Sequence, residues 1–91
     1  MTGKILHGDQ KFLNPAVSPH SGSIRATLVK ESYNNKDIDY CSALLIKDCS
    51  RTVTLDFDFH NKSGKKLSIK KANILIDVIT KLRDSIDEVI V

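Results

Sequence analysis

The chain lacks a long apolar run, and this bounds where it can work. No window approaches the roughly 18 consecutive apolar residues of a membrane-spanning helix, and residues 1–9 lack the apolar core of a secretory signal. We therefore expect a cytoplasmic protein with no membrane partner. Cysteine is also scarce, because Cys41 and Cys49 are the only two. In a cytoplasm we expect both as reduced thiols that serve as small hydrophobic side chains.

Motifs for catalysis are missing as well. The serines and cysteines lie in no nucleophile motif, the three histidines are scattered, and no glycine-rich phosphate loop follows an expected strand. Helix-turn-helix, zinc-finger and RNA-recognition signatures are also missing. The sequence therefore predicts a protein that is not an enzyme and that uses no cofactor or metal.

Proline and glycine are rare outside the first quarter of the chain. Residues 1–22 hold both prolines, three of the four glycines and apolar residues without a period. This composition predicts an irregular N-terminal arm, in which residues 4–7 are a candidate edge strand. We expect residues 23–91 to form a single α+β domain, since 91 residues is the size of one domain.

Alternating apolar and polar residues predict an antiparallel β-meander of three strands. The expected elements are a strand from Ser23, a turn at residues 32–39, a strand at residues 40–47, a turn at residues 48–50 and a strand at residues 51–60. The first turn contains Asn34-Asn35, and asparagine tolerates the left-handed backbone of a tight turn. The clean alternation in residues 51–60 predicts one exposed sheet face and one covered face.

The expected cover is one long amphipathic helix at residues 68–91, with Ser68 as its N-cap. Its apolar stripe has steps of three and four residues and contains Ala72, Leu75, Ile79, Leu82, Ile86 and Val89. The predicted fold class is therefore α+β, a small antiparallel meander packed on one long C-terminal helix. At about 35 Å, this helix outreaches a compact domain of its size, whose radius of gyration would be near 12 Å.

The apolar arc of the helix is wider than a three-stranded sheet needs. A second copy or a different protein would bury the excess, and the candidates for self-association are Ile76, Val78, Leu82 and Ile90. In the alternative interpretation, the N-terminal arm folds back over the helix through Phe12, Leu13 and Val17. Sequence patterns give these two interpretations equal weight.

Charge is distributed unevenly although the net charge is only +3. A basic pole without acids contains Lys62, Lys65, Lys66, Lys70 and Lys71, and an acidic pole contains Asp84, Asp87 and Glu88. Lysines at a helix start and acids at its end oppose the helix dipole, so helix stability does not explain them. The basic pole is a candidate site for phosphate or nucleic acid, and its simpler interpretation is a solvated loop.

A second polar pattern lies on the expected strand at residues 51–60. Asp56, Asp58 and His60 alternate, so their side chains share one face at about 6.5 to 7 Å spacing. No further ligand for a cation is evident, and a metal site needs a supporting shell. We interpret this face as polar, exposed to solvent and able to present acidic groups to a basic partner.

Together these patterns predict a small interaction protein that binds a partner protein and forms a homodimer through its C-terminal helix. Regulators and inhibitors have this profile, including the small proteins of phages and mobile elements, although fold alone does not imply function. The alternative is a nucleic-acid-binding protein that uses the basic pole for phosphate contacts. A sensor for a small anion at the helix start is a third class.

Overall fold

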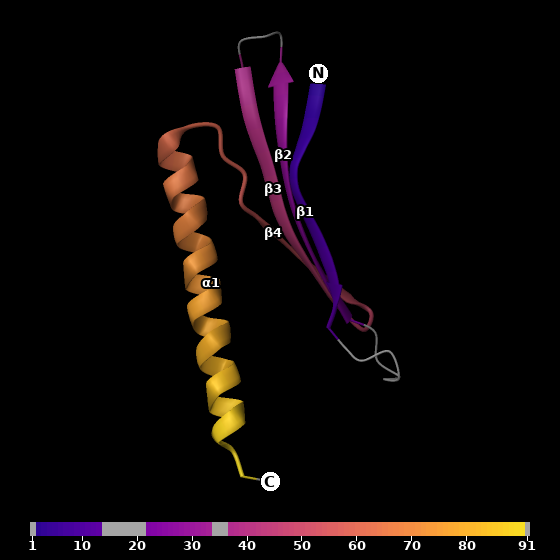
Figure 1. The fold of residues 1–91 in the computed structure, drawn as a ribbon, viewed down its shortest axis with the longest axis vertical. Coiled ribbons are helices and arrows are strands. Elements are labelled where there is room, and N and C mark those ends of the chain that lie inside the picture. The colour runs from indigo at the N-terminus through magenta and orange to yellow at the C-terminus, as the bar shows by residue number, and fades with distance from the viewer. Residues whose placement is uncertain (1, 14–21, 34–36, 91) are drawn as a thin grey trace.

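The computed structural model describes residues 2–13, 22–33 and 37–90. Its elements are β1 (Thr2–Phe12), β2 (Gly22–Tyr33), β3 (Asp37–Asp48), β4 (Arg51–Asp56) and α1 (Lys62–Glu88). The strands form one open antiparallel sheet in the order β1-β2-β3-β4, and α1 stands beside it (Figure 1). The predicted α+β class is confirmed, and the candidate N-terminal edge strand is present as a fourth strand.

Strand β1 is longer than the sequence pattern indicates. An irregular conformation is predicted for residues 1–22, and this is wrong for Thr2–Phe12, which pairs with β2 along its whole length. The pairing register shifts between Ile5 and His7, so Leu6 is an extra residue that breaks the period-two pattern. The rest of the arm, residues 14–21, lies outside the described residues.

The other strands place one apolar face toward the helix. In the strand register, Ala26 lies opposite Leu44, and Leu44 lies opposite Leu55. These three side chains therefore share one face of the sheet. Strand β4 ends at Asp56, short of the predicted residue 60. Beyond it, the Ser42 amide of β3 donates to the Asp58 carboxylate (2.7 Å) and not to a backbone carbonyl of the neighbouring segment. The predicted turn at Asn34-Asn35 lies outside the described residues.

Helix α1 begins six residues earlier than predicted. Its N-cap is Asn61, whose side-chain oxygen accepts from the Gly64 amide at 2.8 Å. Ser68 therefore lies inside the helix, and its hydroxyl donates to the carbonyl oxygen of Phe57 (2.9 Å). The first turn has no apolar residue, which is why periodicity missed it. No helix in the described ranges is long and apolar enough to cross a membrane.

The helix and the sheet do not close into a compact core. Among the described residues, no hydrophobic side chain is fully buried, and no Cα of α1 lies within 8 Å of a strand Cα. The Cα radius of gyration is 16.6 Å, against about 12 Å for a compact chain of this length. Close packing of the helix on the sheet is therefore not reached within one chain.

The β3–β4 turn contains a strained residue. Cys49 has φ 55°, a left-handed conformation that favours glycine. We expect the unfolding free energy of Cys49→Gly to exceed that of Cys49→Ala by about 1 kcal/mol. Chemical denaturation of the two variants measures this difference. Both variants remove the thiol, so the comparison isolates the backbone. Equal stability of the two variants would contradict the strain.

Candidate functional site

An apolar cleft of about 600 Å³ separates the sheet from the helix. The sheet contributes Ile24, Ala26, Leu28 and Leu44, the connection contributes Phe57 and Phe59, and α1 contributes Ile69, Ala72, Leu75, Ile76 and Ile79. These residues come from the sheet face and helix stripe that the sequence predicts to pack together. They line a cleft because the helix stands off from the strands.

The helix is anchored near its start. The Ser68 hydroxyl donates a hydrogen bond to the Phe57 carbonyl, and the Lys71 ammonium donates to the Asp56 carbonyl at 2.6 Å. The same ammonium lies 5.0 Å from the centroid of the Phe57 ring, within the range of a cation–π contact. These contacts place the first turns of α1 against the end of β4.

The structure separates the four self-association candidates. Ile76 lines the cleft, whereas Val78, Leu82 and Ile90 are exposed and lie outside its lining. Ile90 also follows the last helical residue and is 99% exposed. The cleft residues Leu75 and Ile79 are absent from the predicted set, although both belong to the apolar stripe that the sequence shows.

The N-terminal arm does not cover the helix through the residues predicted for that role. Phe12 is 82% exposed and Leu13 is 52% exposed, and neither lines the cleft. Val17 lies outside the described residues. The alternative interpretation, in which the arm buries the excess apolar surface, is therefore wrong for Phe12 and Leu13.

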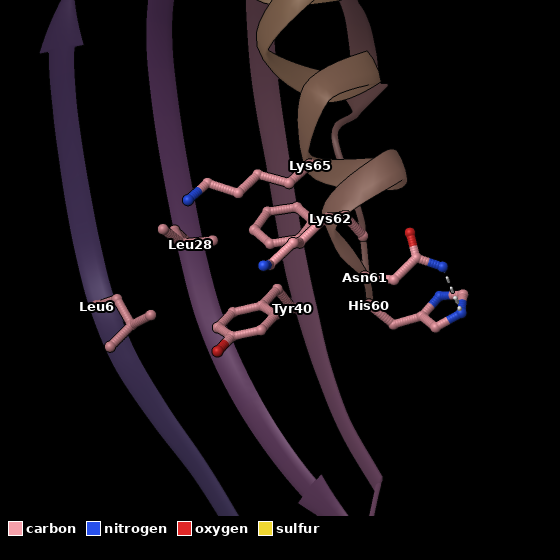
Figure 2. Close-up of a pocket in the computed structure, with 8 residues that line it drawn as sticks. Leu6, Leu28, Tyr40, His60, Asn61, Lys62 and Lys65 are labelled. Atoms are coloured by element: carbon pink, nitrogen blue, oxygen red, sulfur yellow. Dashed lines mark hydrogen bonds between the residues drawn. The ribbon is translucent and has the colours of Figure 1, made fainter.

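The basic pole borders a second hollow, of about 430 Å³. At its floor the Tyr40 and Phe59 rings stack, with centroids 4.8 Å apart and planes at 12°. Figure 2 shows the side chains of Lys62 and Lys65 reaching over this hollow from the first turn of α1. Lys66 and Lys70 do not line it. The structure thus brings an aromatic pair to two of the five predicted lysines.

The predicted acidic face does not form a metal site. The Asp58 carboxylate accepts from the Ser42 amide. The His60 ring lies 3.4 Å from the Asn61 amide nitrogen, and both residues border the aromatic hollow (Figure 2). Asp56 is exposed. In the described part of the chain, no three acidic, histidine or cysteine side chains are arranged to hold a metal ion.

The two charged poles remain far apart on α1. Its 27 residues span about 40 Å, with no acid in the first turn and no base in the last. Within the described residues, the ion pairs join helix neighbours only, Lys81 to Asp77 and Arg83 to Asp84. Asp87, Glu88 and the lysines of the basic pole therefore have no ion-pair partner in this part of the chain.

Cys41 lies in β3 and Cys49 in the β3–β4 turn, and neither forms a disulfide. Cys41 is half-buried in β3, and burial raises the pKa of its thiol, with smaller contributions from the nearby charges of Glu31 and Asp58. A thiol with a raised pKa stays protonated at neutral pH and is a poor nucleophile. The raised pKa therefore disfavours Cys41 as a nucleophile.

No protein family, curated protein or solved structure matches this chain.

The helix anchor generates a stability prediction. Ser68→Ala removes the hydrogen bond to Phe57, so we expect it to lower the unfolding free energy by about 1 kcal/mol. Chemical denaturation measures this change. Lys70→Met is the matched control, because it alters the same part of α1 without touching the anchor, and it should shift stability by less than about 0.5 kcal/mol. Equal effects of both variants would show that the anchor does not hold the helix.

Proposed function

We propose that this chain is a small non-enzymatic protein-interaction module. It acts as a regulator or inhibitor by binding the surface of a partner protein, and it self-associates through α1. The observation that carries this proposal is the open apolar cleft between the sheet and α1, which no described side chain of this chain fills. A monomer rarely leaves so large an apolar surface in contact with water.

The exposed side chains on α1 support the same function. Large apolar residues are more than half exposed along most of the helix, including Ile69, Ile76, Ile79, Leu82 and Ile86. Burying one such side chain contributes about 1.5–3 kcal/mol. Association with another polypeptide therefore stabilises a chain that is too small to bury this surface alone.

Substitution within the cleft tests the proposal. We expect the wild-type chain to sediment as an oligomer, and Leu75→Glu to weaken association by at least roughly 100-fold, because the carboxylate would be buried without a partner. Analytical ultracentrifugation over a range of concentrations measures this directly. Ile74→Glu is the matched control, since it makes the same change at an adjacent helix position that does not line the cleft.

Two results would contradict the proposal. One is a wild-type chain that stays monomeric at all concentrations and binds no other protein. The other is a Leu75→Glu variant that associates as tightly as Ile74→Glu. Circular dichroism of both variants separates loss of association from loss of folding, because α1 supplies most of the helical signal.

A second candidate function is nucleic-acid binding by the basic pole. The stacked Tyr40 and Phe59 beneath Lys62 and Lys65 favour it, because single-stranded sites combine cationic grooves with aromatic surfaces. Phosphate contacts would dominate, so little base preference is expected.

Fluorescence anisotropy with a labelled single-stranded oligonucleotide tests this candidate. If it holds, Tyr40→Ala should lose about 1–3 kcal/mol of binding free energy, and combined alanine substitution of Lys62 and Lys65 should flatten the salt dependence. Lys4→Ala with Lys11→Ala is the matched control, because it removes the same charge from β1. Equal losses from both lysine pairs would indicate unspecific attraction and exclude this site.

A further inference from the structure

We infer that the occupant of the cleft is α1 of a second copy, which runs antiparallel to the first about a twofold axis beside Leu75 and Ile76. This inference rests on the proposed function, and it names the partner and its orientation. Three observations carry it. They are the exposed area of the chain, the positions of the apolar residues along α1, and the opposite charges at the two ends of α1.

The exposed area matches what a stable dimer buries. A compact chain of 10.1 kDa exposes about 5,300 Å², whereas this chain exposes 7786 Å², leaving roughly 2,500 Å² in excess. Obligate homodimers bury about 1,000–2,500 Å² from each subunit. One second copy therefore suffices to cover the excess.

In an antiparallel pair, the apolar residues of one α1 lie opposite apolar residues of the other. With the axis beside Leu75 and Ile76, Leu75 lies level with Ile76 of the partner subunit, and Ala72 lies level with Ile79 of the partner subunit. All four positions line the cleft in each chain. A twofold interface uses the same patch on both subunits, and this patch satisfies that requirement.

The charges select the antiparallel orientation. Lys65 and Asp87 are about six helical turns apart and thus lie on nearly the same side of α1. The twofold rotation then places Lys65 beside the partner's Asp87, and each basic pole beside an acidic pole. A parallel pair would instead bring like charges together at both ends. Since these residues have no ion-pair partner among the described ones, both are available for this contact.

Distances between spin labels test the orientation in the full chain. The labels go on Ser63→Cys or on Asn73→Cys, both exposed positions of α1, in a background with Cys41→Ser and Cys49→Ser whose sedimentation is checked first. We expect roughly 40 Å between the two copies of label 63 and less than about 20 Å between the two copies of label 73. Short distances at both positions, or long ones at both, overturn the inference.

Charge reversal tests the pairing of poles independently. Lys65→Glu and Asp87→Lys should each raise the dimer dissociation constant about tenfold at low salt. A mixture of the two variants restores both contacts in a heterodimer, so it should associate as tightly as wild type. Unchanged affinity of either single variant overturns the inference.

Failure of this inference differs from failure of the proposed function. A wild-type dimer with the wrong label distances overturns the antiparallel arrangement and leaves the interaction function standing. A wild-type monomer overturns the inference, and it overturns the proposed function as well if no other protein binds the cleft.

Discussion

The short connection between β4 and α1 is the constraint on which the rest of the structure depends. Tyr40 and Phe59 are joined by two backbone hydrogen bonds, of 2.8 and 3.0 Å, and the helix N-cap follows only two residues later. The helix start is thereby fixed against the sheet. Because a helix of about 40 Å is held by contacts near its start, its apolar stripe faces the sheet without packing on it.

This arrangement gives the opposed charges of α1 a physical meaning. Lysines near a helix start and acids near its end each cost about 0.3–1 kcal/mol at exposed positions, and in the described chain no ion pair to Lys65, Asp87 or Glu88 offsets that cost. An intermolecular contact between unlike poles would offset it. The apolar cleft of the structure and the charge pattern of the sequence are independent features, and both favour the same kind of partner.

Sequence patterns predicted the sheet and the helix, but they did not predict how the two meet. Alternation identified β2 and β4, and the two expected turns at residues 32–39 and 48–50 bounded β3. Strand β1 escaped this pattern because residues 7–11 are polar or glycine and offer no alternation, and the extra residue Leu6 also shifts its register. The apolar periodicity also did not predict the cleft. Periodicity assigns residues to a face of a strand or helix, but it does not specify the distance between two such faces. Tyr40 shares a hollow with Lys62 and Lys65 because it pairs with Phe59 in the connection to α1, a pairing between residues far apart in the sequence.

Lys65 couples the two candidate functions, because it lines both the apolar cleft and the aromatic hollow. In the proposed antiparallel dimer, its ammonium would lie beside the partner's Asp87 and would be less available to a phosphate. Nucleic acid would then compete with the acidic pole for the same cation, and binding of one ligand would weaken the other by the same factor. Partner binding and nucleic-acid binding would therefore compete at Lys65, since a single ammonium cannot fully pair with two anions at once.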